Sequence, residues 1–326
     1  MERVIHTQLS NFLKDNSIIS PFQHGFHQGR STVTNLLSAT TDWIFSCDLK
    51  SNVDTVFFDL SHAFDTITFT KLFLKLARVG IGGELLGWLE SYVVGRKQST
   101  VVDGVQSPFL PVLSGVPQGS VLGPILFSIF INDLPDYLAS HNPSLSVSLQ
   151  LFADDIKSYQ VVNTLDDAIK FQNVISSVFN WCDYWQLKPN LAKCTVLHIG
   201  HSNKHFKYGL KGALISSTPI VKDLGLLLDE TLSFTPHIAS IVSRARARCK
   251  IFLRSFLTRD LLVMKNFFIT YVRPLLEYCS PIWSPISKCD VKRLESVLRY
   301  FSNLVPTCRY LPYKRRLVLL SLDSLQ

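Results

Sequence analysis

Two adjacent acidic residues stand between two strand-forming stretches, and they constrain the fold more than any other feature of the sequence. Residues 145–152 alternate apolar and polar side chains, Ala153, Asp154 and Asp155 form a turn, and residues 156–162 return as a second strand. This pattern predicts a β-hairpin with two carboxylates at its tip. Neighbouring carboxylates repel each other and the apolar residues before them limit their hydration, so a divalent cation is their natural partner.

A third acidic residue, Asp59, ends the β-rich stretch 53–58, where a buried carboxylate is costly unless a cation or a donor meets it. Capping of the following turn is the competing interpretation, favoured by about two to one when Asp59 is taken alone. Asp154 and Asp155 change this balance, because three carboxylates on neighbouring strands can hold two Mg²⁺ ions about 3.5 to 4 Å apart for phosphoryl transfer. We therefore predict that these three residues bind two Mg²⁺ ions, with Mn²⁺ as an alternative.

Helical and strand-like patterns are mixed along the rest of the chain, which predicts an α+β fold. Expected helices cover residues 2–14, 31–44 with a cap at Ser31 or Thr32, 69–79, 85–94, 120–130 and 166–187, and most of the chain from Pro236. Expected strands cover residues 53–58, 97–102, 109–113, 194–199 and 220–228. The polar, glycine-containing segment 22–30 is expected to be a loop.

Charge is unevenly distributed along the chain. Residues 1–240 hold 17 Lys and Arg against 20 Asp and Glu, whereas residues 241–316 hold 16 against 4. An acidic region followed by a basic one suits a protein that grips a polyanion, and nucleic acid is the obvious polyanion. On charge alone, a well-solvated basic surface explains the pattern equally well.

No part of the sequence has the features of a membrane span or a secretory signal. The most apolar stretch, residues 121–131, holds a Gly, a Pro and a Ser and is far shorter than the roughly 20 residues that a bilayer requires. The seven cysteines are odd in number and include no C-x-x-C pair, which argues against a disulfide framework and a zinc site. We expect an intracellular protein with reduced, mostly buried thiols.

Several longer motifs, taken in their order, resemble a known family. The stretches FFDLSHAFD, SGVPQGSVLGPILFSIFINDLP, LFADD and WQLKPNLAKCTVLHIG are similar to the successive palm motifs of reverse transcriptases from non-long-terminal-repeat (non-LTR, LINE-type, jockey-like) retrotransposons. FQHGFHQGRST resembles the fingers motif of this family, VKDLGLLLD its primer-grip region, and YVRPLLEYCSPIWSP a stretch that follows the palm.

The resemblance implies a right-hand polymerase with partial fingers, a palm built on an antiparallel sheet and a helical, thumb-like C-terminal region. Residues 1–230 would hold the fingers and the palm with its primer grip, and residues 231–326 the basic thumb-like region. Asp59, Asp154 and Asp155 would be the catalytic, metal-binding acids.

The resemblance also assigns residues to the incoming nucleotide. Phe64 would lie below the sugar, where its ring excludes a 2′-hydroxyl; a core phenylalanine is the competing interpretation. Gln118 would contact the base or sugar, and Gly119, together with Gly115, would let the backbone approach closely. Arg30 would clamp the triphosphate in a bidentate manner.

Lys193 matches the motif lysine that follows the long helix, and it would protonate the leaving pyrophosphate; a solvated surface lysine is the competing interpretation. In the C-terminal region, the cations at positions 244, 246, 248, 250 and 254 wrap around a helix and do not form one stripe. We expect Arg244, Arg246 and Arg248 to bind nucleic acid, because a phosphate backbone would relieve their mutual repulsion. For the aromatic residues Tyr271, Tyr278 and Trp283, core packing is favoured over base stacking by about three to one.

The sequence departs from the family pattern in two respects. His27 stands where relatives often carry a basic residue, which weakens triphosphate binding near neutral pH. The chain also begins past the first fingers strand and has no room for an endonuclease, so it is expected to be a fragment of a retrotransposon polyprotein.

The function predicted from these features is an RNA-directed DNA polymerase that extends a DNA primer 3′-hydroxyl on an RNA template with dNTPs. The main alternative is a catalytically inactive, nucleic-acid-binding remnant of such a polymerase. An RNA-dependent RNA polymerase is disfavoured by FADD and by Phe64. The resemblance of the primer grip and of the stretch after the palm disfavours both this polymerase and an intron maturase.

Overall fold

The computed structural model describes residues 1–143 and 147–325 and contains two compact units. The first unit ends at Pro219 and the second begins at Ile220. This division lies before the boundary predicted at residue 230. The reason is that residues 220–229, which were expected to belong with the palm, pack on the first long helix of the second unit. The assignment of fingers, palm and thumb-like regions stays a prediction.

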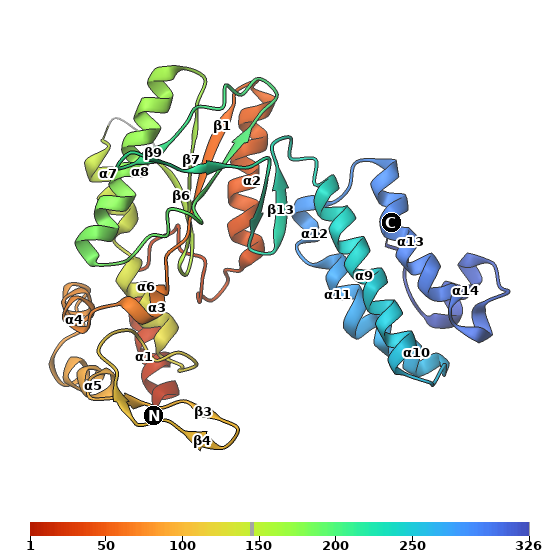
Figure 1. Cartoon of the computed structure of the whole chain (residues 1–326), viewed down its shortest axis with the longest axis horizontal. Helices are drawn as coiled ribbons and strands as arrows, with labels where there is room; N and C mark the ends of the chain where they lie inside the picture. Colours follow the sequence, from red (N-terminus) through yellow and green to blue (C-terminus); the bar gives the residue numbers. More distant parts are fainter. Residues whose placement is uncertain (144–146, 326) are drawn as a thin grey trace. The chain divides into compact units, whose positions relative to one another are not determined.

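A five-stranded sheet in the order β11–β8–β1–β7–β6 forms the centre of the first unit (Figure 1). Its strands are β1 (Val53–Phe58), β6 (Ser148–Phe152), β7 (Asp155–Val161), β8 (Thr195–Ile199) and β11 (Ser216–Ser217). β1 pairs antiparallel with β7 and β8, β6 pairs antiparallel with β7, and the short β11 runs parallel to β8. The predicted antiparallel sheet is confirmed. The strand predicted for 145–152 begins at residues outside the described part of the chain, and its described part is β6.

Helices cover both faces of this sheet. The first four residues of β1 are buried, and since successive strand residues point to opposite faces, their burial requires cover on both sides. The long helices α2 (Thr32–Asp48) and α8 (Leu165–Trp185) lie along the sheet (Figure 1). Each helix begins with a capping box, at Ser31 for α2, one of the two caps predicted, and at Thr164 for α8.

Six shorter helices complete the helical part of the first unit within the described residues. They are α1 (Glu2–Asp15), α3 (Ala63–Thr66), α4 (Phe69–Arg78), α5 (Gly83–Val93), α6 (Gly123–Ile131) and α7 (Leu134–His141). α6 is buried on nearly all sides, which explains why its sequence is almost wholly apolar. Within the described residues, no helix combines the length and the apolar character that crossing a bilayer requires.

Short hairpins precede α6. β2 (Lys97–Gln98) pairs with β5 (Leu110–Pro111); the two lie within the strands predicted over 97–102 and 109–113. Between them, β3 (Val101–Val102) and β4 (Val105–Gln106) form a hairpin that was not predicted. Its turn, Asp103 and Gly104, has positive φ at both residues, as a type I′ turn requires, and Asp-Gly is the sequence signal for such a turn. A further pair consists of β9 (Gly209–Leu210) and β10 (Ala213–Leu214).

A hairpin opens the second unit. β12 (Ile220–Asp223) and β13 (Leu226–Asp229) pair antiparallel, so the prediction of a single strand over 220–228 is wrong. Leu224 and Gly225 form the turn between them with φ of +44° and +90°. A Cβ at position 225 would stand 3.2 Å from the ring of Tyr278, so glycine suits both the backbone angle and the close contact.

The rest of the second unit is helical, which confirms the pattern predicted from Pro236 onward. Its α-helices are α9 (Thr235–Ser255), α10 (Leu261–Phe267), α11 (Arg273–Glu277), α12 (Ser280–Trp283), α13 (Lys288–Asn303) and α14 (Tyr313–Leu320). A π-helical turn, η1 (Phe268–Val272), and a 3₁₀ turn, η2 (Pro306–Cys308), lie between them. α9 packs against α13 and carries the basic stretch. All seven cysteines are free and five are buried, as expected.

Candidate active site

Strand pairing brings the predicted acids to the same end of the sheet, where their strands begin or finish. Phe58, the last residue of β1, lies opposite Ile156 of β7. One residue further toward this end, the same register places Asp59 opposite Asp155. β6 and β7 form the predicted hairpin, and Asp154 lies in its two-residue turn at the same end of the sheet. We call this β6–β7 element the acid hairpin.

The charge of Asp59 affects the ionisation of Asp154. Burial raises the pKa of Asp154 above its ordinary value, a hydrogen bond from its own backbone N–H lowers it, and the charge of Asp59 raises it further. Within residues 1–143 and 147–325, no three His, Cys, Asp or Glu side chains converge closely enough to hold a metal ion. The donor set of hard oxygen atoms fits Mg²⁺, and the metal site stays a prediction.

The loop after α8 places Lys193 beside Asp59. The backbone oxygen of Asp59 accepts a hydrogen bond from the N–H of Asn190, and the N–H of Ser61 donates to the oxygen of Lys188, each at 2.8 Å. These bonds fasten the loop to the end of β1. As a result, Nζ of Lys193 lies 3.9 Å from Oδ1 of Asp59, with both side chains partly exposed. An exposed pair of this kind contributes little to stability, so the ammonium group is available to a ligand.

Phe64 lies on α3, the short helix that follows Asp59. Its ring stacks on that of Phe127 in α6, with centroids 4.3 Å apart, and meets Phe26 edge-on at 6.4 Å. The residue is half-buried against the core. The ring is therefore held by core packing and still has an exposed part, so the proposed exclusion of a 2′-hydroxyl stays a prediction.

The loop before α6 folds back against α3. The N–H of Gly115 donates to the oxygen of Ile67 at 2.7 Å, and a Cβ at Gly115, whose φ is +90°, would stand 2.7 Å from Cα of Asp65. Gly115 thus lies close to the backbone of α3, and its approach to a nucleotide stays a prediction. Gly119 has a φ of +75° and no described atom within 4 Å of the position a Cβ would take, so it leaves open space beside the loop.

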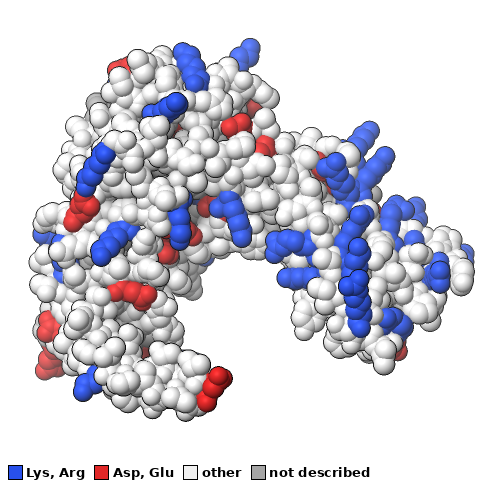
Figure 2. Space-filling view, in the orientation of Figure 1, with Lys and Arg blue, Asp and Glu red and all other residues white. Residues whose placement is uncertain are grey.

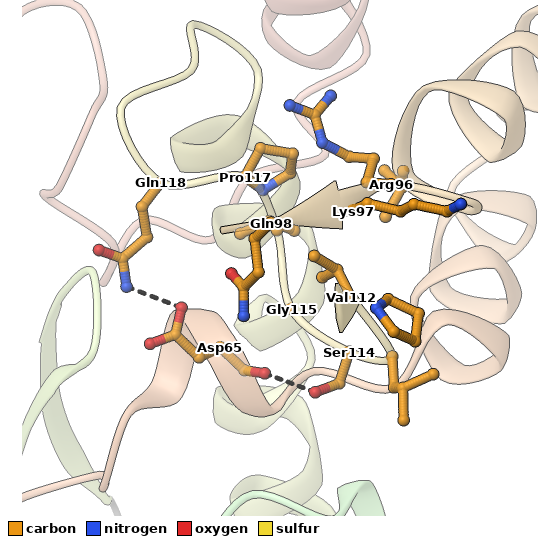
Figure 3. A pocket seen from close by; sticks show the side chains of 13 residues that line it. Asp65, Arg96, Lys97, Gln98, Val112, Ser114, Gly115, Pro117 and Gln118 are labelled. Carbon is orange, nitrogen blue, oxygen red and sulfur yellow. Dashed lines mark hydrogen bonds between the residues drawn. The ribbon is translucent and has the colours of Figure 1, made fainter. Parts of the chain in front are cut away.

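A hydrogen bond joins Gln118 to Asp65, an acid that was not predicted from the sequence. Nε2 of Gln118 donates to Oδ1 of Asp65, and the hydroxyl of Ser114 donates to the backbone oxygen of Asp65, each at 2.7 Å (Figure 3). These residues line a pocket of about 750 Å³ that also includes Arg96 and Lys97. The position of Asp65, directly after the aromatic residue of the motif, was the available signal.

The fingers motif forms a loop, as predicted, and Arg30 closes it. The guanidinium group donates to the backbone oxygen of Pro21 and to that of Gln23, the latter at 3.1 Å. Burial and the neighbouring Arg30 lower the pKa of His27, so this imidazole is neutral near pH 7. Arg30 is therefore bonded within its own loop, and its contact with a triphosphate stays a prediction.

The arginines of the basic stretch lie on the outside of α9. Arg244, Arg246 and Arg248 are exposed, whereas Ala245 and Cys249 face the interior of the unit. Figure 2 shows Lys and Arg side chains gathered on the second unit. The placement leaves these arginines accessible, and their contact with nucleic acid stays a prediction.

The cations of α9 reach different neighbours, as expected of residues that wrap around a helix. Arg246 donates to the hydroxyl of Ser296 at 2.7 Å, and Arg248 donates to the backbone oxygen of Tyr271 at 2.6 Å. Trp283 is buried, as predicted, but Tyr271 and Tyr278 are 58% and 42% exposed, so the prediction of core packing is wrong for these two. Tyr271 lies in the π-helical turn η1, where the wider turn changes the direction in which side chains point.

Comparison with known proteins identifies the family. Residues 1–226 match the family described as reverse transcriptase (RNA-dependent DNA polymerase). The chain belongs to the reverse transcriptase family. The matched region contains the fingers motif, the acid hairpin and the loop of Gln118.

Relatives of this reverse transcriptase domain include polymerases of non-LTR retrotransposons. The chain is 30% identical over 320 residues to the probable RNA-directed DNA polymerase from transposon BS of Drosophila melanogaster. It is also 30% identical over 254 residues to the RNA-directed DNA polymerase from mobile element jockey of Drosophila funebris. The alignments cover 95% and 76% of this chain but only 35% and 27% of those relatives, so the chain spans about a third of their length. The predicted relationship to jockey-like elements is confirmed.

A solved structure has the same fold. The structure of telomerase from Candida albicans in complex with a TWJ fragment of telomeric RNA matches 99% of this chain and 58% of that one, with a TM-score of 0.54. Sequence identity is 11%, so the likeness concerns the fold alone. It confirms the predicted right-hand polymerase fold.

Proposed function

We propose that the chain is an RNA-directed DNA polymerase that adds deoxynucleotides to the 3′-hydroxyl of a DNA primer on an RNA template. The proposal is carried by the end of the sheet that holds Asp59, Asp154 in the turn of the acid hairpin and Asp155 at the start of β7, and where the pKa of Asp154 is raised by burial and by Asp59. These carboxylates would hold two Mg²⁺ ions, or Mn²⁺ in their place. The metal ions would activate the attacking hydroxyl and stabilise the leaving pyrophosphate.

Three further side chains would hold and select the substrate. Because Nε2 of Gln118 donates to Asp65, the Oε1 end of the amide is the end left to accept from the base or sugar of a nucleotide. The ring of Phe64 would exclude a 2′-hydroxyl. Lys193, with its Nζ 3.9 Å from Asp59, would give a proton to the leaving pyrophosphate.

The second unit would bind the template and primer through their phosphates. Arg244, Arg246 and Arg248 are exposed on α9, in a region with 16 Lys and Arg against 4 Asp and Glu. Arginine contacts to phosphates provide affinity without base preference, as a polymerase that copies any sequence requires.

A catalytically inactive nucleic-acid-binding remnant is the second candidate. Arg30 favours this alternative, because its guanidinium group is bonded to backbone oxygens of its own loop. His27 adds to it, because a lowered pKa leaves the imidazole neutral where a cation would help to bind a triphosphate.

Primer extension separates the two candidates. The purified chain is incubated with labelled oligo(dT) annealed to poly(rA), dTTP and Mg²⁺, and binding of the same duplex is measured by fluorescence anisotropy. A polymerase lengthens the primer, and the product disappears with EDTA or with Asp154→Asn. Wild-type protein that binds the duplex without extending it would support the remnant. Extension that survives Asp154→Asn would contradict the two-metal assignment.

A further inference from the structure

The fingers loop covers the outer edge of the acid hairpin. β6 is the last strand of the sheet, and its outer edge faces residues 22–24. The N–H of Leu151 donates to the oxygen of Phe22, and the N–H of His24 donates to the oxygen of Leu151, each at 2.9 Å. The acid hairpin is therefore held by β1 on one side and by the fingers loop on the other.

Gln23 extends this contact to the turn that carries Asp154. Its side chain is fully buried, and its Oε1 accepts hydrogen bonds from the N–H of Ala153 at 3.0 Å and from that of Gly25 at 2.8 Å. Within the described part of the chain, Nε2 of Gln23 has no hydrogen-bond partner. The acceptor oxygen is thus the physical reason for a polar side chain at this buried position.

The bond to Ala153 matters because of the backbone of the turn. Ala153 has a φ of +56°, a region that residues with a Cβ rarely adopt. Its N–H lies in the turn and outside the ladder between β6 and β7. Without the oxygen of Gln23, a buried N–H would lose its acceptor and the unfavourable φ would lose a restraint. A change of φ at Ala153 would move the next residue, Asp154.

Gly25 allows the loop to come this close. A Cβ at position 25 would stand 2.5 Å from the backbone nitrogen of Ala153 and 3.1 Å from Oε1 of Gln23. No side chain fits in this gap without displacing the turn. Gly25 therefore leaves the space in which Oε1 of Gln23 can accept from the N–H of Ala153.

We propose that Gln23 is a positioning residue that holds the turn of Asp154 in the geometry required for metal binding. This inference rests on the proposed function and gives the fingers motif a task separate from any contact with the triphosphate. Residues that orient metal ligands typically change metal affinity or activity by about 10- to 100-fold when they are removed. Gln23 acts on the metal through the backbone of Ala153 and touches no substrate.

The test compares two buried amides that support the same strand. Gln23→Leu removes the acceptor from the turn. The matched control is Asn35→Leu, because Asn35 is also buried and its Nδ2 donates to the oxygen of Leu151 at 3.0 Å, away from the turn. Mn²⁺ binding is measured by the electron paramagnetic resonance of free Mn²⁺, circular dichroism checks the fold, and primer extension gives the half-maximal Mg²⁺ concentration.

We expect Gln23→Leu to weaken Mn²⁺ binding and to raise the half-maximal Mg²⁺ concentration by about tenfold or more, whereas Asn35→Leu leaves both unchanged. The proposal would be overturned if Gln23→Leu kept the Mn²⁺ affinity and the half-maximal Mg²⁺ concentration of the wild type. It would also be overturned if Asn35→Leu weakened Mn²⁺ binding as much as Gln23→Leu does. If Gln23→Leu does not fold, Gln23→Met, which also lacks the amide oxygen, replaces it and the same values decide. If the wild type binds Mn²⁺ without extending a primer, the proposed function fails while the Mn²⁺ affinities still decide the role of Gln23.

Discussion

Asp154 in the first unit and Asp229 in the second both stand where a strand ends, but their surroundings differ. Asp229 ends β13 and is only 7% exposed. It accepts hydrogen bonds from the backbone N–H groups of Thr231, Ser233 and Phe234 at 2.9 to 3.1 Å. Burial raises the pKa of Asp229, but these bonds and one from the Thr231 hydroxyl outweigh it, so the pKa lies below its ordinary value.

Asp154 has the opposite balance. Burial and the nearby charge of Asp59 raise its pKa, and these two effects exceed the opposing hydrogen bond from its own N–H. A carboxylate that shapes a turn collects donors from that turn, whereas a carboxylate that serves a cation keeps an unfavourable charge. The two aspartates look alike in the sequence, and their donors distinguish them.

The largest effect expected from this comparison is on catalysis. Asp154→Asn should reduce the rate of primer extension on the order of 10²- to 10³-fold or more, as expected when a group that stabilises charge in the transition state is lost. Asp229→Asn should retain extension at a temperature where the variant is folded. Steady-state extension on poly(rA)/oligo(dT) measures both. Activity of Asp154→Asn within tenfold of the wild type would remove the distinction between the two acids.

For stability, the substitution at Asp229 should have the larger effect and the one at Asp154 the smaller. Asp229→Ala should lower the free energy of unfolding by about 2 to 4 kcal/mol, because several buried donors lose a charged acceptor and each such bond contributes about 1.5 to 3 kcal/mol. Asp154→Ala serves as the matched control and should cause no comparable loss. Urea unfolding followed by circular dichroism gives both values. Equal losses would show that Asp154 also shapes its turn.

The sequence predicted those parts of the structure that local patterns encode. The acid hairpin, β1 and the cap of α2 follow from alternation and from capping within a few residues. The turn at Leu224 and Gly225 was missed because the apolar residues on both sides read as one continuous strand.

The side chains that support the site could not be predicted in this way. The bond from Gln118 to Asp65 joins residues 53 positions apart, and the bond from Ala153 to Gln23 joins residues 130 positions apart. Only the folded chain brings such pairs together, because no local pattern in the sequence records which distant donor meets which acceptor. For the same reason, the motifs predicted the three metal-binding acids but not these two long-range hydrogen bonds.

The ring of Phe64, on the short helix that follows Asp59, extends the comparison from charge to shape. Phe64→Ala should shift the preference for dNTPs over rNTPs by about 10- to 100-fold, because exclusion of a small group from a pocket is worth about 1 to 3 kcal/mol. Competitive incorporation of dTTP and UTP measures this ratio, and the melting temperature reports the loss of stacking on Phe127. A folded variant with unchanged sugar preference would leave Phe64 as a core residue alone.

The basic helix tests whether the second unit has a function beyond its structural acids. Replacing Arg244, Arg246 and Arg248 by Gln should lower the slope of log affinity against log salt by roughly one unit for each phosphate that the variant no longer neutralises, with equal weakening on all template sequences. Salt titrations of fluorescent template–primer binding give the slope. A matched triple variant removes the same charge from exposed positions elsewhere in the unit: Arg309, Lys314 and Arg315. Equal slopes for both triple variants would reduce the effect to net charge.

The smallest expected effect is on the pH dependence of stability in EDTA. The pKa of Asp154 is raised in the folded state, so its contribution to stability is complete below the unfolded pKa near 3.8 and is lost as pH rises through the folded pKa. The pKa of Asp229 is lowered, so its contribution is present above the unfolded pKa and is lost as pH falls through the folded pKa.

The two Asn variants should therefore change the melting temperature with opposite signs. At pH 7, Asp154→Asn should raise it by roughly 1 to 3 °C, because the variant removes an unfavourable charge, and Asp229→Asn should lower it. As pH falls toward 3.5, the wild-type carboxyl of Asp154 becomes protonated and resembles the amide, so the gain should vanish. The loss at Asp229 should persist over most of this range and begin to shrink only below about pH 3.8, where the unfolded carboxyl becomes protonated while the folded one, with its lowered pKa, still keeps its charge. Calorimetric scans between pH 3.5 and 7.5 measure both trends, and a lowered melting temperature for Asp154→Asn at pH 7 would mean that its charge is already compensated within the protein.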